Sequence, residues 1–523
     1  MVYLLDYGAG NVRSVVNAIK SLGEEVKFVT SPGDILGANR LVFPGVGNFG
    51  QIMHNLDQRG YIEPLLTYLE SNRPFFGICL GLQVLFEGSQ EAPEIKGLGF
   101  LKGRVKRFRV DLSVPHIGWN GIRTHQPSKI FNGLQGDEKF YFVHSYYVSP
   151  EDSNVILTTT DYGCEFVSAI QKGNIIATQF HPEKSGRQGL LLLKNFLDLS
   201  AISVKPPRTV QTTRLAKRII ACLDVRTNDQ GDLVVTKGDQ YDVREKGEVR
   251  NLGKPVDLAK RYYLEGADEI TFLNITGFRD FPLEDMPMLE VLRRTSENVF
   301  VPLTIGGGIR DYIDKNGRRY TALEVASEYF RSGADKVSIG SDAVLIVEEY
   351  LRTGKATGKS AIEEISRVYG NQAVVISIDP KRVYVNSPDQ VPHPVIETSI
   401  PGPNGERFCW YQCTIKGGRE ARDLDAITLA QIGERLGAGE ILLNCIDRDG
   451  TNLGFDIELI NAVKEAISIP VIASSGAGRV EHFYEVFTKT QAESALAAGI
   501  FHRREVSISA VKQYLTGKVE IRP

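Results

Sequence analysis

Eight short apolar segments, separated by stretches with the spacing of amphipathic helices, follow one another through residues 215–523. Short strands that alternate with helices predict parallel pairing, and eight of them in succession predict a (β/α)8 barrel. The expected strands span residues 218–223, 269–273, 301–305, 336–339, 374–378, 440–444, 471–473 and 494–497. No other feature restricts the possible folds of the chain as strongly.

A weak internal repeat supports the barrel. Leu223-Asp224 corresponds to Ile378-Asp379 in the second half, and the sequence of residues 266–270 resembles that of residues 437–441. We therefore expect residues 215–523 to form a (β/α)8 barrel, also called a TIM barrel, built of two half-barrels.

The N-terminal part alternates strands and helices in another pattern. Residues 2–6, 25–30 and 41–47 read as strands, with a helix over residues 12–22. This order predicts an α/β domain over residues 1–200, with a doubly wound, mostly parallel sheet that binds ligands at the carboxyl ends of its strands. Residues 201–214 contain a double proline and little apolar periodicity, which is typical of a linker.

Cys79 lies between two glycines in the sequence Gly77-Ile78-Cys79-Leu80-Gly81. An apolar run before this cysteine and an amphipathic run after it indicate a strand, a sharp turn and a helix, which is the geometry of a nucleophile elbow. The N-terminus of such a helix favours a thiolate. A lone cysteine of this kind is more often a buried core residue, so the interpretation depends on the rest of the chain.

Two further motifs fall at the same expected sheet edge. Pro44-Gly45-Val46-Gly47 follows a strand and could offer backbone N–H groups to a developing oxyanion. His181 and Glu183 follow the strand at residues 175–180, where the imidazole could act as a base and the carboxylate could orient it. Each motif is weak alone, but together with Cys79 they supply a nucleophile, a base, an orienting group and an oxyanion donor.

The barrel carries its candidate chemistry at the carboxyl ends of strands. Asp224 and Asp379 end the first and fifth strands, so they would face each other across the mouth as a possible acid and base pair. Without the repeat, helix caps or loop aspartates would explain them equally well. Turns after strands three, four, seven and eight form two candidate phosphate cradles, with contacts from Gly307, Gly308, Gly340, Ser341, Ser475, Gly476, Ala498 and Gly499.

Composition excludes several other classes of protein. The net charge of −3 gives no electrostatic reason to expect a nucleic-acid or membrane partner, and the apolar runs are too short for a membrane span. The six cysteines lack disulfide or zinc spacing, so we expect a reducing compartment and no metal. No targeting segment is visible, which favours the cytoplasm but leaves open a processed plastid form.

The three N-terminal motifs resemble, in order and spacing, the signatures of the class I glutamine amidotransferases. The resemblance implies that Cys79 attacks the carboxamide of glutamine, that His181 protonates the departing ammonia, and that Glu183 holds the imidazole. It also implies that Gly45 and Gln83 contact the glutamine and that Val46 and Gly47 form the oxyanion hole.

Residues 215–225, 305–309, 446–451 and 474–478 resemble the cyclase subunit of the imidazole glycerol phosphate synthases, and the two parts together resemble the fused eukaryotic type. The resemblance implies histidine biosynthesis: ammonia and a bisphosphate, N'-phosphoribulosyl-formimino-aminoimidazole-carboxamide ribonucleotide, give imidazole glycerol phosphate and aminoimidazole-carboxamide ribonucleotide (AICAR). Asp224 and Asp379 would be the acid and base pair, and no cofactor is needed. Further substrate contacts are expected from Lys237, Asp449, Gly450 and Thr451.

Four charged residues lie near the starts of strands one, two, four and six, and alternate in sign: Arg218, Glu269, Lys336 and Glu440. They could simply form structural ion pairs at the bottom of the barrel. The resemblance implies a gate to an ammonia channel, with the amino-terminal face of the barrel docked on the amidotransferase in a monomer. It further implies allostery, in which barrel ligand stimulates glutamine hydrolysis.

Some positions and segments depart from the family pattern, and two other functions stay open. Asn274 stands where the family usually has aspartate, so we assign it no acid or base role. Residues 311–320 and 383–413 look like insertions, and the second could brace the interface or cover the mouth. The chain could instead join an amidotransferase to a phosphosugar isomerase barrel, which has no use for ammonia, or be a non-catalytic sensor, although no nucleophile or carboxylate is missing.

Overall fold

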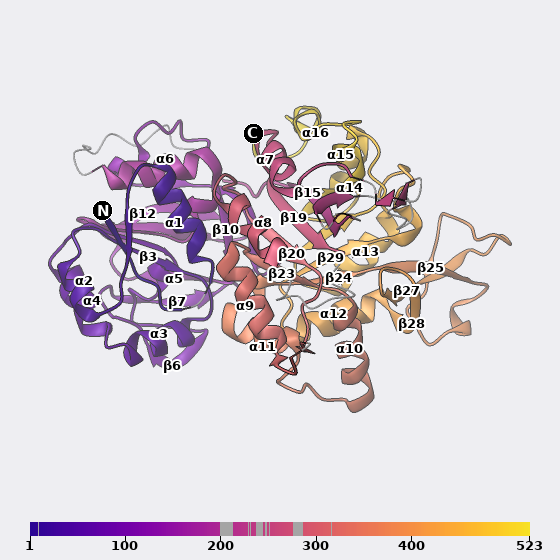
Figure 1. Ribbon diagram of the computed structural model, residues 1–523, viewed down its shortest axis with the longest axis horizontal. Coiled ribbons are helices and arrows are strands. Elements are labelled where there is room, and N and C mark those ends of the chain that lie inside the picture. Colours follow the sequence, from indigo (N-terminus) through magenta and orange to yellow (C-terminus); the bar gives the residue numbers. More distant parts are fainter. Residues whose placement is uncertain are drawn as a thin grey trace.

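A computed structural model describes residues 1–8, 10–198, 213–228, 230, 232–236, 244–245, 248–249, 251–275, 286–314 and 316–523. Two lobes lie side by side (Figure 1): an N-terminal α/β lobe in indigo and purple, and a barrel lobe in pink to yellow. Within the described residues no helix is long and apolar enough to cross a membrane. Lys237 and residues 201–212 of the expected linker lie outside the described residues.

The N-terminal lobe is built on one large sheet. Its strands run in the order β2 (Val26–Phe28), β1 (Val2–Leu4), β3 (Leu41–Gly45), β4 (Phe75–Cys79), β14 (Ile175–Thr178), β13 (Glu165–Lys172), β11 (Tyr146–Pro150), β7 (Gly103–Arg107), β5 (Gly88–Ser89) and β6 (Ala92–Lys96). Strands β2 to β14 pair in parallel, but β13, β11 and β7 pair antiparallel. The sheet is therefore more mixed than the alternation of strands and helices predicts.

Helices and a small second sheet complete this lobe. Its helices are α1 (Val12–Ser21), α2 (Pro32–Gly37), α3 (Phe49–Gln58), α4 (Ile62–Glu70), α5 (Leu80–Gln83) and α6 (Gly186–Leu197). Strands β8 (His116–Gly121) and β10 (Lys139–His144) pair as an antiparallel ribbon, and β12 (Ile156–Asp161) joins β13 to β9 (Arg123–Thr124). Two separate apolar cores, one around Phe43 and one around Phe76, stabilise the lobe.

The C-terminal lobe is a closed parallel barrel, as the sequence predicts. In the described part of the chain its eight strands are β15 (Arg218–Thr227), β19 (Glu269–Asn274), β20 (Leu303–Gly306), β23 (Lys336–Ile339), β24 (Val374–Ile378), β29 (Glu440–Asn444), β30 (Val471–Ser474) and β31 (Ser494–Ala497). Pairing of β15 with β31 closes the ring. Buried apolar side chains fill the lumen, among them Ile220, Val375 and Leu442, so the barrel is packed inside.

Helices surround the barrel (Figure 1): α7 (Pro255–Leu264), α8 (Met286–Ser296), α9 (Ala322–Ser332), α10 (Ser341–Thr353), α11 (Ala361–Tyr369), α12 (Ala426–Leu436), α13 (Ile457–Ala466), α14 (Val480–Lys489), α15 (Gly499–His502) and α16 (Ile508–Leu515). Strand β15 continues past Asp224 because its last residues pair with β16 (Leu233–Thr236). Short ribbons β17 (Arg244–Glu245) with β18 (Glu248–Val249), and β21 (Tyr312–Ile313) with β22 (Arg319–Tyr320), project from the barrel.

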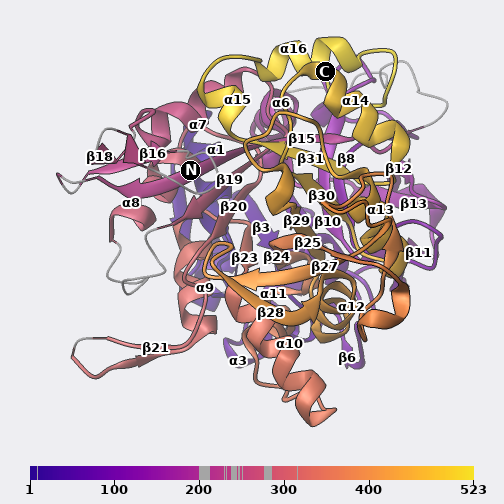
Figure 2. The ribbon, with the colours of Figure 1, turned by 90° about the vertical axis from the view of Figure 1, so that its right-hand side faces the viewer.

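The longer insertion forms a small sheet at the side of the barrel away from the N-terminal lobe. Strands β25 (Pro380–Val385), β26 (Ile396–Glu397), β27 (Phe408–Ile415) and β28 (Glu420–Asp425) pair antiparallel. Viewed from the barrel side, β25, β27 and β28 lie in front (Figure 2). This position is far from the junction of the lobes, so the insertion does not brace the interface.

The two lobes share a hydrophobic core at their junction. Trp119 and Tyr141 of the N-terminal lobe belong to the same buried cluster as the outer side of the barrel strands. The Trp119 indole N–H donates to the Asp268 carbonyl at 3.1 Å. Lys184 forms an ion pair of 2.6 Å with Asp335, which also accepts from the Asn11 amide. The amino-terminal face of the barrel therefore docks on the lobe that carries Cys79.

Candidate active sites

Cys79 occupies the strained turn that its flanking glycines predict. It ends β4 and precedes α5, with φ of 53° and ψ of −103°, a region that non-glycine residues rarely adopt. A Cβ atom on Gly81 would lie 2.1 Å from the Phe43 carbonyl oxygen, and one on Gly77 would lie 2.5 Å from the Gly81 oxygen. Only glycine fits at either position, so the local sequence fixes the elbow.

His181 and Glu183 are paired beside the cysteine. The His181 Nδ1 lies 2.8 Å from Glu183 Oε1, and both side chains are buried. Burial alone would lower the pKa of His181, but the Glu183 carboxylate and contact with Cys79 raise it to about 10. The imidazole is thus held as a cation next to the sulfur, which suits a thiolate nucleophile.

Replacing Glu183 by glutamine is expected to lower the pKa of His181, because a neutral amide then takes the place of the negative carboxylate that stabilises the imidazolium. The folded pKa of about 10 lies above the ordinary value of 6.5. Protonation of His181 therefore stabilises the fold fully below pH 6.5, and this contribution is lost as the pH rises through 10. An NMR titration of the ring nitrogens measures the pKa, and an unchanged value in Glu183→Gln would contradict this assignment.

A pair of buried glutamines extends this site. The Gln83 amide donates to the Tyr146 carbonyl and to Gln179 Oε1, both at 3.1 Å. The Gln179 amide donates in turn to Cys79 Sγ at 3.4 Å. The sequence motifs missed Gln179, although its position two residues before His181 could have suggested it.

The glycine turn lies next to Cys79, but the backbone N–H of Val46 in this turn is hydrogen-bonded to another residue. Gly45 pairs in register with Cys79, and Val46 and Gly47 line a cavity of about 40 Å³ together with Cys79 and His181. The Val46 N–H donates to the Tyr7 hydroxyl oxygen at 2.8 Å. The turn therefore lies beside Cys79, and the Val46 N–H is hydrogen-bonded to Tyr7.

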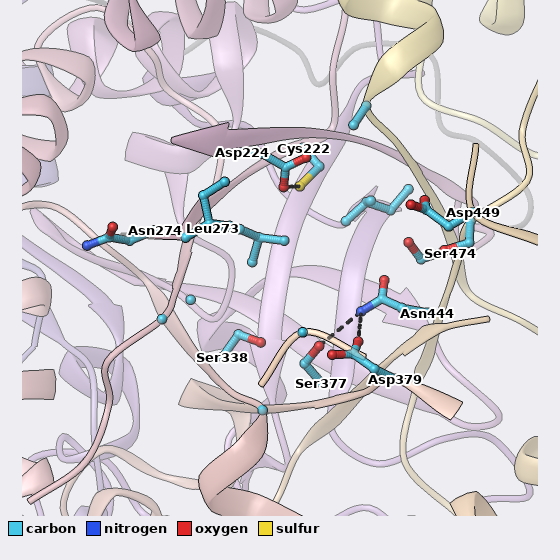
Figure 3. Close-up of a pocket in the computed structure, with 18 of the residues that line it drawn as sticks. Cys222, Asp224, Leu273, Asn274, Ser338, Ser377, Asp379, Asn444, Asp449 and Ser474 are labelled. Atoms are coloured by element: carbon cyan, nitrogen blue, oxygen red, sulfur yellow. Dashed lines mark hydrogen bonds between the residues drawn. The ribbon is translucent and has the colours of Figure 1, made fainter. Parts of the chain in front are cut away.

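A larger cavity of about 550 Å³ opens at the carboxyl ends of the barrel strands. Asp224 and Asp379 line it from opposite sides (Figure 3). Asn444 donates to Asp379 Oδ1 at 2.9 Å and to the Ser377 hydroxyl at 3.0 Å, which fixes the orientation of that carboxylate. The mouth therefore presents two carboxylates across one space, as the repeat predicts.

All eight predicted phosphate contacts line the same cavity: Gly307, Gly308, Gly340, Ser341, Ser475, Gly476, Ala498 and Gly499. Asp449, Gly450 and Asn274 line it as well. The backbone at Gly307 and Gly476 has φ of +102° and +95°, and a Cβ atom there would lie within 2.3 Å of a carbonyl oxygen. Thr451 is absent from this lining, and its hydroxyl donates to the Arg448 carbonyl.

Basic side chains that no motif predicted also line the mouth: Arg226, Arg310, Lys416, Arg419 and Arg503. Lys416 and Arg419 come from the turn between β27 and β28, so the small sheet at the side of the barrel contributes to the mouth. Positive charge around glycine turns suits a ligand with phosphate groups.

At the opposite end of the barrel the four predicted charged residues form one buried network, the charged ring: Arg218, Glu269, Lys336 and Glu440. Arg218 lies 2.8 Å from Glu269 and is also paired with Glu440. Lys336 lies 2.7 Å from Glu269 and 2.6 Å from Glu440. Burial would raise the pKa of Glu440, but Arg218 and Lys336 lower it, so the carboxylate remains charged.

Lys336 also lines the small cavity that contains Cys79. This cavity lies between the lobes, with Tyr141 on one side and Tyr369 on the other. The cysteine site, the charged ring and the barrel mouth therefore follow one another along the barrel axis.

Comparisons with known proteins agree with both halves of this arrangement. A family model for class-I glutamine amidotransferases matches residues 3–199, and one described as histidine biosynthesis protein matches residues 218–507. Imidazole glycerol phosphate synthase hisHF, chloroplastic, of Arabidopsis thaliana is 60% identical and covers 100% of this chain and 89% of its own. The hisHF protein of Emericella nidulans is 57% identical over 98% and 97% of the two chains. The separate subunit HisH of Syntrophotalea carbinolica is 48% identical over 38% of this chain.

Proposed function

The chain belongs to the family of fused imidazole glycerol phosphate synthases, and on that premise we propose that Cys79 supplies ammonia for a cyclase reaction between Asp224 and Asp379. The chain is an enzyme of histidine biosynthesis that combines an amidotransferase and a cyclase. The main support for the proposal is that Cys79 and Lys336 of the charged ring line one and the same cavity. Turnover of the bisphosphate with glutamine or with ammonium tests it.

At the first site, the Cys79 thiolate attacks the carboxamide carbon of glutamine and forms a tetrahedral intermediate. The His181 imidazolium gives its proton to the departing nitrogen, so that ammonia leaves and a glutamyl thioester remains. His181 then removes a proton from water, which attacks the thioester and releases glutamate and the Cys79 thiolate. Glu183 holds the imidazole throughout, and the Gln179 amide donates to the sulfur.

Ammonia must reach the barrel without a proton, because ammonium is not a nucleophile. The small cavity between the lobes lies beside Cys79 and His181, and Lys336 stands at its barrel end. We propose that the network of Arg218, Glu269, Lys336 and Glu440 opens to admit ammonia into the barrel. The sharing of each carboxylate between two cations supports this, since one pair can part while another remains.

Lys336→Met is expected to uncouple the two reactions, so that more than one glutamate forms for each imidazole glycerol phosphate. Removal of one buried cation also destabilises the fold by about 3–5 kcal/mol, because carboxylates are left without compensation. The ratio of the two products, measured by chromatography, reports the coupling. Lys512→Met is the matched control, because Lys512 on α16 is also buried and is paired with Asp268 rather than with a carboxylate of the ring. A ratio of one in Lys336→Met would contradict the gate.

At the barrel mouth, ammonia attacks the bisphosphate held between the two glycine cradles. Asp379, oriented by Asn444, and Asp224 on the opposite side would move the protons that accompany ring closure and release of AICAR. The basic residues at the mouth would balance the charge of the two phosphates. Asp449 and Gly450 line the cavity and are expected to contact this substrate.

We further propose that the chain acts as a monomer in the cytoplasm, with glutamine and the bisphosphate as its ligands and with neither nucleic acid nor membrane as a partner. The junction between the lobes supports a monomer, because the amidotransferase meets its cyclase within one chain. The Arabidopsis thaliana relative is named chloroplastic, so a plastid location is the alternative that fractionation would test.

A further inference from the structure

One tyrosine hydroxyl is hydrogen-bonded to both backbone polar groups of Val46. The Val46 N–H donates to the Tyr7 oxygen at 2.8 Å, and the Tyr7 hydroxyl donates to the Val46 carbonyl. Tyr7 lies just after β1 and is 2% exposed. Two strands of the sheet, β1 and β3, thus fix the glycine turn through a single side chain.

This arrangement keeps the Val46 amide away from the chemistry it is placed to serve. Val46, Gly47 and Cys79 line the same cavity, and an oxyanion hole needs an N–H that points at the substrate oxygen. An N–H that is bonded to Tyr7 is not available for that role. We propose that the Tyr7 hydroxyl is a latch that holds the Val46 peptide in a resting orientation and so restrains glutamine hydrolysis. The inference rests on the proposed function of Cys79.

The latch keeps its hydrogen bonds over a wide pH range. Burial raises the pKa of Tyr7 well above its ordinary value, although the Val46 backbone opposes the shift. The hydroxyl therefore stays protonated and remains both a donor and an acceptor. Neutral hydrogen bonds of this kind are weak enough to be exchanged for others when a neighbouring element moves.

The barrel contacts the other side of the same turn. The carbonyl of Val368, in the last turn of α11, lies 3.0 Å from the position that a Cβ atom on Gly47 would occupy. Tyr369 lines the cavity with Val46. Helix α11 is followed by β24, and β24 ends immediately before Asp379 at the mouth. A shift of α11 when the barrel fills would therefore press on Gly47 and release Val46 from Tyr7.

Tyr7→Phe tests the latch, because it removes the partner of the Val46 amide but keeps the ring. The rate of glutamine hydrolysis with an empty barrel is expected to rise about tenfold, the change that one ordinary hydrogen bond makes in an equilibrium constant. With saturating imidazole glycerol phosphate, kcat should equal that of the wild type, and KM for glutamine should stay unchanged. Stimulation by the barrel ligand is thus expected to shrink by the same factor.

Tyr68→Phe is the matched control, since Tyr68 is buried in the same lobe and donates to a backbone carbonyl, that of Pro74. This variant should keep the wild-type rates in both states. An equal or lower rate for Tyr7→Phe with an empty barrel would overturn the latch. A wild type without Cys79-dependent hydrolysis would overturn the proposed function as well, so the two failures are distinguishable.

Amide hydrogen exchange provides a test that needs no variant. In the wild type, imidazole glycerol phosphate should accelerate exchange at Val46, because the amide leaves Tyr7, while exchange at Leu69 in the remote α4 stays the same. Unchanged protection of Val46 in the presence of the ligand would overturn the proposal even if Tyr7→Phe failed to fold.

Discussion

Cys79→Ala is expected to lose glutamine-dependent formation of imidazole glycerol phosphate by about 10⁴-fold or more, because no other group can form the thioester. The same variant should keep turnover with ammonium salt at alkaline pH, where free ammonia enters the cyclase without the first site. Loss of the bisphosphate's absorbance measures both reactions. The strained backbone at Cys79 fits alanine as well as cysteine, so the fold should be retained.

Cys164→Ala is the control for this variant. Cys164 is a half-buried cysteine of the same lobe, and it lies outside the cavity that contains Cys79. It should support both nitrogen sources at the wild-type rate. Full glutamine-dependent turnover in Cys79→Ala would contradict the assignment of the nucleophile. Absence of turnover with ammonium in the wild type would contradict the cyclase and favour an isomerase or a sensor.

Asp379→Asn should have the second-largest effect, with the opposite pattern. Cyclisation is expected to fall by about 10²–10⁴-fold with either nitrogen source, since an amide cannot exchange a proton with the substrate. Glutamine hydrolysis at Cys79 should persist. The variant keeps the shape of the side chain and an oxygen that accepts from Asn444, so the loss reports on proton transfer.

The exposed Asp389, in the insertion that follows Asp379, offers a control, and Asp389→Asn should retain full activity. Glutamate release and loss of the bisphosphate are followed together in each variant. Ammonium-dependent cyclisation at the wild-type rate in Asp379→Asn would remove Asp379 from the reaction and leave Asp224 as the remaining carboxylate of the pair.

The parts of the fold that depend on short-range patterns were predictable from the sequence. Each barrel strand appears as a short apolar run. At positions 77 and 81 the elbow has room only for glycine. The pairing of His181 with Glu183 follows from their separation of two residues at a strand end. Asp224 and Asp379 could be placed opposite each other because the repeat gives their positions in the ring.

Other features depend on contacts between distant segments, which leave no local signal. Tyr7 and Val46 meet because β1 and β3 are neighbours in the sheet. Lys416 and Arg419 reach the mouth only because β27 and β28 fold back on each other as a hairpin. The antiparallel half of the N-terminal sheet was missed for the same reason, since strand direction depends on pairing.

We propose that nitrogen passes from Cys79 through the barrel to Asp224 and Asp379 without entering solvent. Turnover with glutamine labelled with ¹⁵N in its amide, in the presence of excess unlabelled ammonium at neutral pH, tests it directly by mass spectrometry of the product. We expect imidazole glycerol phosphate to carry ¹⁵N in full. Product labelled only in proportion to the mixed ammonia pool would show that the nitrogen leaves the protein and would contradict the channel.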